Sequence, residues 1–140
     1  MGYIFILKKL AFTCFKTRKY SDAEKYFNVI SDMLPDVTKN PTNLFAARKN
    51  LLLFYTYTDI NYALEYGERM IADQNDFYPV HTKELFFMQG NVHFLRGDYR
   101  RAKLMYRKVL KMGPKPELEA KLLNNLAFAC WMHMLDIPKI

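Results

Sequence analysis

The stretch from Lys83 to Pro116, KELFFMQGNVHFLRGDYRRAKLMYRKVLKMGPKP, has the pattern of two helices joined by a tight turn. Gly97 tolerates positive φ and can end the first helix, and the Asp98 carboxylate can cap the second. Gly90 has no side chain, so the two backbones can approach closely where the helices cross. Pro114 stops the second helix because it has no amide donor. The stretch therefore predicts a helical hairpin.

This unit resembles the 34-residue tetratricopeptide (TPR) repeat in its length and in its marker positions. The markers are a large apolar residue, a glycine, a turn, a small residue, an aromatic residue and a closing proline. In chain order they are Phe86, Gly90, Gly97 to Tyr99, Ala102, Tyr106 and Pro114. The resemblance implies hairpins that cannot bury their apolar faces alone and must stack on copies of themselves.

Two copies of this pattern precede it. The first spans residues 4–37 and repeats the turn and the small residue at Arg18 and Ala23. A weaker copy spans residues 44–77, and there Gly67 stands where the other copies have an aromatic side chain. Glycine weakens a helix and leaves a gap at this position, so we expect the middle copy to be the most loosely packed.

The repeats account for most of the chain. After the copy at 83–116, one more helix is expected over about residues 118–134. We therefore predict a single all-α domain over residues 1–140. Its architecture is a TPR-like helical-hairpin solenoid of three repeats plus a terminal helix.

Composition agrees with a folded, intracellular protein. Hydrophobic residues make up 51% of the chain and aromatic ones 16%, which is too many for a disordered chain. Cys14 and Cys130 fall on core positions of predicted helices, so they are interpreted as small apolar residues and no disulfide is expected. No stretch is long enough and free enough of charge to span a bilayer. A cytoplasmic location is favoured.

The first 20 residues leave a mitochondrial location open. They hold five basic residues and no acidic one, as organelle transit peptides do. They also carry the core positions of the first predicted helix, which cleavage of a leader would remove. We therefore favour a structural interpretation of this segment.

Catalytic and cofactor chemistry are not expected. His81, His93 and His133 lie on separate predicted elements, and His93 falls at a helix-packing position where a buried histidine is more common than a base. The sequence has no paired metal-ligand motif, phosphate-binding glycine loop or nucleophile elbow. We predict a protein that is not an enzyme and that has no cofactor or metal.

The TPR resemblance implies that a partner binds the inner wall formed by the first helix of each repeat. Helical spacing places basic, polar and aromatic residues on that wall: Lys8, Lys9, Phe12, Arg48, Lys49, Phe87, Asn91 and Phe94. We expect some of the aromatic residues to pack against neighbouring repeats instead. The remainder suit an acidic or amphipathic protein segment, with aromatic anchors and with Lys and Arg to attract it.

The last predicted helix is apolar on every side in its second half. Between Leu126 and Leu135 only His133 is polar. A helix that is apolar all round is normally buried, and leaving it in water creates a patch that monomers avoid. Either the chain is truncated after this helix or another subunit covers it, and we predict the second. The predicted contact residues are Phe128, Trp131, Met132 and Leu135.

The net charge of +7 makes nucleic acid a rival partner. Cations recur at spacings of three and four along the second helix of the last repeat, which places them in one stripe: Arg100, Lys103, Arg107 and Lys111. A solvated face is the favoured interpretation, followed by a site for an acidic protein and then by a site for RNA phosphate.

These patterns together predict a non-catalytic scaffold or adaptor that is a subunit of a larger assembly. It would bind protein through the inner wall and through the apolar terminal helix. An RNA- or ribosome-associated subunit that uses the cationic stripe is the alternative function.

Overall fold

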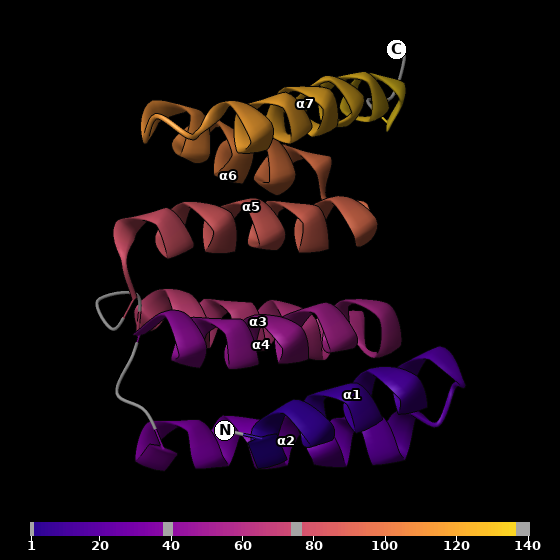
Figure 1. Cartoon of the computed structure of the whole chain (residues 1–140). Coiled ribbons are helices and arrows are strands. Elements are labelled where there is room, and N and C mark those ends of the chain that lie inside the picture. Colours follow the sequence, from indigo (N-terminus) through magenta and orange to yellow (C-terminus); the bar gives the residue numbers. More distant parts are fainter. Residues whose placement is uncertain (1, 38–40, 74–76, 137–140) are drawn as a thin grey trace. The chain divides into compact units, whose positions relative to one another are not determined.

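The structure is a computed structural model, and it describes residues 2–37, 41–73 and 77–136 (Figure 1). Within these ranges the chain forms seven α-helices and no β-strand, so the predicted all-α class is confirmed. The helices are α1 (Gly2–Lys16), α2 (Tyr20–Val37), α3 (Pro41–Thr58), α4 (Ile60–Ala72), α5 (Pro79–Leu95), α6 (Tyr99–Lys111) and α7 (Pro116–Asp136). Their arrangement as a TPR-like stack stays a prediction.

The helices fall into two compact units, Met1–Ala63 and Leu64–Ile140, and the boundary lies within α4. In the first unit α1 packs against α2, and α2 packs against α3. In the second unit α5 packs against α6, and α7 packs against both of them. That a single domain covers the whole chain stays a prediction.

The turn between α1 and α2 is closed by a backbone hydrogen bond across six residues. Lys19 N–H donates to Cys14 O at 2.8 Å, and Arg18 within this turn has a φ of 64°. This left-handed region is uncommon for a residue with a side chain and is adopted freely by glycine. The turn that the pattern predicts is therefore present, in a conformation that is unfavourable for arginine.

An aromatic cluster joins α1, α2 and α3. Phe54 lies at its centre, with ring centroids 5.4–6.3 Å from those of Phe15, Tyr20, Phe27 and Tyr55. Phe12 of α1 meets Phe27 of α2 edge to face at 5.2 Å. Aromatic pairs in this geometry contribute more than the area they bury. The aromatic residues of the first unit therefore serve largely to hold its helices together.

The turn between α5 and α6 is closed by the same kind of backbone hydrogen bond, and its residues suit this conformation better. Asp98 N–H donates to His93 O at 2.9 Å, and the residue with positive φ, 82°, is Gly97. The Asp98 carboxylate accepts from Arg101 N–H at 3.2 Å and so caps α6. These contacts confirm the turn and capping roles predicted for Gly97 and Asp98.

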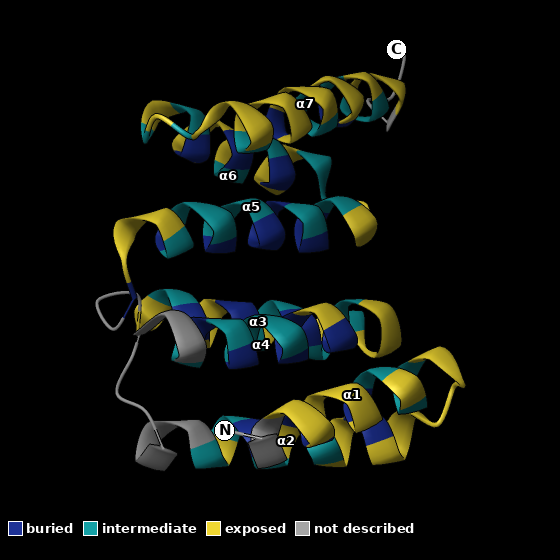
Figure 2. Cartoon of the chain, viewed as in Figure 1, coloured by how far each residue is buried: buried dark blue, intermediate teal, exposed yellow. Residues whose placement is uncertain are grey.

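The side chain of Tyr106 fills the space at Gly90. A Cβ atom at this position would lie 2.6 Å from Cε1 of Tyr106, whose side chain is fully buried. Gly90 therefore makes room for this ring of α6, and a close approach of the two backbones stays a prediction. Figure 2 shows buried residues along α5, whereas most of α6 and of α7 is exposed or half-buried. The core cluster on α6 and α7 consists of Ala102, Tyr106, Val109, Leu122 and Ala129.

The gap predicted at Gly67 does not exist, so that expectation was wrong. Gln89 of α5 is only 1% exposed, and a Cβ atom on Gly67 would overlap its Oε1 atom. Gln89 Nε2 donates to Leu64 O of α4 at 3.0 Å. The glycine therefore makes room for a polar side chain from α5, which joins α4 to α5 by a hydrogen bond.

Candidate binding surfaces

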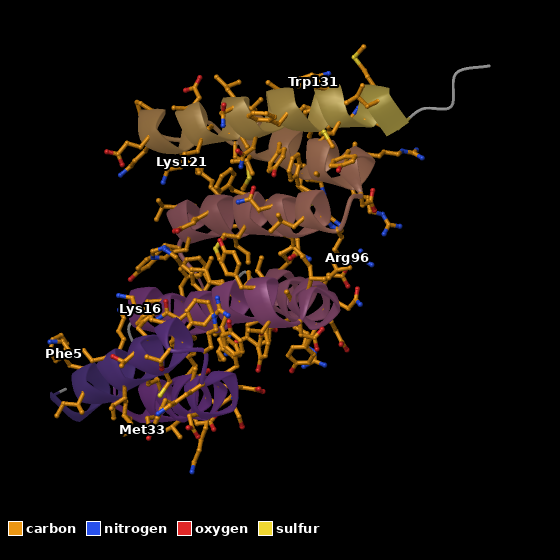
Figure 3. The ribbon with its side chains drawn as sticks, turned by 90° about the vertical axis from the view of Figure 1, so that its right-hand side faces the viewer. Phe5, Lys16, Met33, Arg96, Lys121 and Trp131 are labelled. Carbon is orange, nitrogen blue, oxygen red and sulfur yellow. The ribbon has the colours of Figure 1, made fainter. Side chains whose placement is uncertain are left out.

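One face of α1 carries a shallow hollow of about 460 Å³ lined by Phe5, Lys8, Lys9, Phe12, Thr13 and Lys16. Lys9 Nζ lies 4.6 Å from the centroid of the Phe5 ring, and this cation–π contact leaves Phe5 58% exposed. Figure 3 labels Phe5 and Lys16 on this helix. The structure thus gathers the predicted residues Lys8, Lys9 and Phe12 on one cationic and aromatic surface, the α1 hollow. Their role in binding stays a prediction.

Arg48 and Lys49 of α3 are half-buried. The residues on either side of them along the helix, Phe45 and Leu52, are buried in the core. Tyr55, one turn further on, donates to Glu24 Oε1 at 3.1 Å, and its burial raises the pKa of its hydroxyl well above the usual value. Much of this helix is thus committed to packing, and binding by Arg48 and Lys49 stays a prediction.

Phe87 and Phe94 of α5 are half-buried and pack against the core of the second unit. The ring centroid of Phe87 lies 5.9 Å from that of Tyr106, and the ring centroid of Phe94 lies 5.3 Å from that of Tyr99. Both rings therefore hold α5 against α6. This is the packing role that was expected for part of the aromatic set, and a role in binding stays a prediction.

Asn91 of α5 joins three helices. Its Oδ1 atom accepts from the Tyr106 hydroxyl of α6 at 2.6 Å and from Asn125 Nδ2 of α7 at 2.9 Å. Burial raises the pKa of Tyr106 to about 12, so its hydroxyl keeps the proton that it donates. These contacts give Asn91 a structural role that spacing alone did not reveal, and its predicted role in binding stays a prediction.

The second half of α7 exposes an apolar face, the α7 apolar face, formed by Phe128, Trp131, Met134 and Leu135. Trp131 is 60% exposed and Leu135 59%, whereas Met132 is half-buried. Figure 3 labels Trp131 on the side of α7 away from α6. The sequence between Leu122 and Leu135 holds no Asp, Glu, Lys or Arg. Three of the four predicted contact residues thus belong to one uncharged, exposed surface.

α6 carries six cations and no acidic residue in its 13 positions. Of the predicted stripe, Arg100, Arg107 and Lys111 are exposed and Lys103 is half-buried. Arg101 forms an ion pair with Asp98, with Nε and Oδ2 3.6 Å apart. The stripe therefore lies on a surface that solvent and a partner can reach.

A second hollow, of about 630 Å³, lies beside α6 and was not predicted. Its wall includes His93 of α5 and, from α6, Arg101, Leu104, Met105, Lys108 and Lys111. A spacing signal was present in the sequence, because Leu104 is the only apolar residue with cations three and four positions away on both sides. Counting cations alone revealed the stripe and missed this leucine.

His93 is buried, as its helix-packing position predicted, and is 6% exposed. Burial lowers the pKa of its imidazole, with Asp98 opposing this effect and Arg101 adding to it, so the ring is neutral at pH 7. Among the described residues, no hydrogen-bond partner reaches its Nδ1 atom. The unpaired atom is itself buried, so it is not exposed to the hollow.

Neither a metal site nor a membrane span is found in the part of the chain that the structure describes. Across residues 5–33, 44–73 and 77–135, His, Cys, Asp and Glu side chains do not gather in threes that could hold a metal ion. In the helices that the structure describes, none has both the length and the apolar character needed to cross a membrane. Cys14 and Cys130 are half-buried free thiols.

The fold is similar to that of a protein of known structure. No family model and no curated protein sequence matches the chain. Among solved structures, the crystal structure of BtubC (BKLC) from P. vanneervenii is similar, with a TM-score of 0.63 and 22% sequence identity. The similarity covers 81% of this chain and 49% of the other, so this chain spans about half the length of BtubC. At this level of identity the similarity concerns the fold alone.

Proposed function

We propose that the chain is a TPR-like helical-repeat module that acts, without catalysis, as a scaffold or adaptor for other proteins in an intracellular assembly. The repeat character is supported by the α1–α2 and α5–α6 hairpins. Each closes its turn with the same six-residue hydrogen bond and buries an alanine, Ala23 or Ala102, early in its second helix. The fold similarity to BtubC over most of the chain is compatible with this proposal.

The observation that carries the proposal is the α7 apolar face. Its four side chains are 49–69% exposed, and each lies three or four positions from another along the helix. Soluble monomers rarely leave a contiguous apolar surface of this kind in water. Because no ionised side chain lies among these residues, a charged partner would gain little there. The occupant that fits is another protein subunit, which covers the face with an apolar helix of its own.

The α1 hollow offers a second contact of different chemistry. Lys8 and Lys9 are exposed and Phe5 is more than half exposed beside them. Exposed cations increase the rate of encounter with acidic partners, and a neighbouring aromatic ring provides an anchor. An acidic or amphipathic segment of the partner is therefore expected here. Replacing Lys8 and Lys9 by glutamate should abolish its capture without changing the helical circular-dichroism signal.

Site-specific crosslinking tests the α7 contact in the native host. A photo-crosslinking amino acid in place of Trp131 should form an adduct with one protein of defined mass. The same substitution at Leu95, an exposed leucine of α5 (56%), is the control and should not form it. The adduct partner is then produced separately and titrated against the chain. Trp131→Ala with Leu135→Ala should raise its Kd about 100-fold or more, and Leu95→Ala less than about twofold.

The isolated chain gives a further measurement of the same face. Without its partner the wild-type protein should self-associate in sedimentation velocity, because the α7 apolar face is left in water. The double variant should associate less. Trp131 is the only tryptophan, so its fluorescence reports on this face alone. A dilution-stable monomer with a water-exposed emission maximum and no adduct at position 131 would contradict the proposal.

A further inference from the structure

Leu104 of α6 is an exposed apolar residue surrounded by cations. It is 53% exposed, and all four residues three or four positions away are exposed arginines or lysines: Arg100, Arg101, Arg107 and Lys108. Residues at these spacings are neighbours on a helix surface, with Cβ atoms about 5–6 Å apart. The surface is therefore an apolar centre with a cationic rim, the Leu104 patch, and not a uniform stripe.

The cations of this rim are mostly without an acidic partner. Among the described residues, Arg101 pairs with Asp98, and no ion pair involves Arg100, Arg107 or Lys108. α6 itself has no acidic residue that could pair with them. Their positive potential is therefore available to a ligand and should attract carboxylates.

The patch adjoins a hollow that can take a side chain. The hollow measures about 630 Å³, and its wall includes Leu104, the half-buried Met105 and Leu110, and the buried His93. Apolar residues and cations line the hollow together, so it suits an apolar side chain flanked by carboxylates.

The chemistry of this face favours a peptide over RNA. Single-stranded RNA is held by aromatic rings on which bases stack. Both aromatic residues of α6 are engaged elsewhere, since Tyr106 is fully buried and the half-buried Tyr99 packs against Phe94. A phosphate backbone also makes no use of an exposed leucine. An amphipathic helix with one apolar residue flanked by carboxylates complements both the centre and the rim.

We propose that the Leu104 patch of α6 binds an acidic amphipathic protein segment. A central apolar side chain of that segment enters the hollow beside Leu104, and its flanking carboxylates pair with Arg100, Arg107 and Lys108. This site is separate from the α7 apolar face, because neither Trp131 nor Leu135 lines the hollow. The two contacts can therefore fail or succeed independently.

A fluorescently labelled helical peptide of about 15 residues tests the site on the full chain. It has one leucine with glutamates three and four positions to either side, the mirror of the Leu104 patch. Leu104→Ala should raise the Kd of this peptide about tenfold or more, while Leu95→Ala changes it less than about twofold. Arg107→Glu should weaken binding strongly and make it less dependent on salt. Lys121→Glu, an exposed cation of α7, is the matched control.

Two competitor ligands decide between a specific site and a general polyanion surface. The same peptide with alanine at its centre should bind about tenfold more weakly, because it lacks the side chain that enters the hollow. Single-stranded RNA of equal net charge should compete poorly. Equal affinity for the leucine and alanine peptides, or efficient competition by RNA, would overturn the proposal, as would the absence of measurable peptide binding at low salt.

Discussion

The α1–α2 and α5–α6 hairpins have the same register, but they join their helices with different chemistry. When their turns are aligned, Ala11 and Ala23 of the first match Gly90 and Ala102 of the second. The two matched pairs lie in buried positions, so both hairpins place small residues where the helices cross. Of these four positions only Gly90 has no Cβ atom, because the Tyr106 ring occupies that space.

The next matched positions show the difference in chemistry. Phe12 and Phe27 meet edge to face at 5.2 Å in the first hairpin, whereas Asn91 and Tyr106 share a hydrogen bond of 2.6 Å in the second. In the first pair each aromatic ring has an aromatic partner, and in the second pair each polar group has a hydrogen-bond partner. A mixed pair would place an unpaired polar group beside an aromatic ring, which is unfavourable when buried. The shared register thus specifies that the two positions are in contact, and the two residues together determine whether the contact is aromatic or a hydrogen bond.

The largest effect is expected from giving the second hairpin the alanine of the first. Gly90→Ala would place a Cβ atom 2.6 Å from the fully buried Tyr106 ring, so α5 and α6 must separate. We expect a loss of about 2–3 kcal/mol in the free energy of unfolding. Urea titration followed by circular dichroism measures the loss, and amide exchange in α5 and α6 locates it.

The reciprocal change, Ala11→Gly, is the control for that experiment. It removes a buried methyl group and lowers helix propensity, and the two effects together should cost about 2 kcal/mol. Gly90→Ala raises helix propensity, so any loss of stability that it causes comes from overpacking against Tyr106. No loss of stability in Gly90→Ala would show that the space at Gly90 is not needed.

The second test exchanges the chemistry of the matched pair. Asn91→Phe removes the acceptor of both the Tyr106 hydroxyl and the Asn125 amide, and we expect it to destabilise the second unit by about 2 kcal/mol. Adding Tyr106→Phe reproduces the Phe pair of the first hairpin and removes the unpaired hydroxyl. The double variant should regain about half of the loss, as a double-mutant cycle would show.

Tyr106→Phe alone supplies the reference value for this cycle. It leaves Asn91 bonded to Asn125 and should cost about 1 kcal/mol, the usual net value of a single hydrogen bond. If the double variant is as unstable as the sum of the single ones, the two positions do not act as a pair, and the comparison of the hairpins fails at this point.

Local features of the fold could be predicted because their causes are local. The positive φ of Gly97, the cap from Asp98 and the need for a small residue at position 90 depend on residues within one hairpin. Gln89 could not be predicted in the same way. Its amide reaches Leu64 O and occupies the space at Gly67, and both partners lie in the preceding helix. A glutamine that counts as polar in a sequence pattern is here among the most buried side chains.

The candidate binding surfaces also differ in how far the sequence could predict them. The α1 hollow follows from spacing along one helix, and so three of its six residues, Lys8, Lys9 and Phe12, could be named in advance. Phe87, Asn91 and Phe94 follow the same spacing on α5, but α6 and α7 cover them in part and give them packing partners. Whether a residue on a predicted wall is free to bind therefore depends on the next helices, which spacing within a single helix does not reveal.

The smallest effect is expected at the turns, at the residue that has positive φ in each hairpin. Arg18 and Gly97 hold matched positions with φ of 64° and 82°. Left-handed backbone costs a residue with a side chain about 1 kcal/mol, so Arg18→Gly should stabilise the first unit by up to that amount. Arg18→Ala removes the charge but keeps the Cβ atom, and it should bring no gain. Gly97→Ala should destabilise the second unit by about 1 kcal/mol. Equal stability of the glycine and alanine variants at position 18 would show that backbone strain is not what separates the two turns.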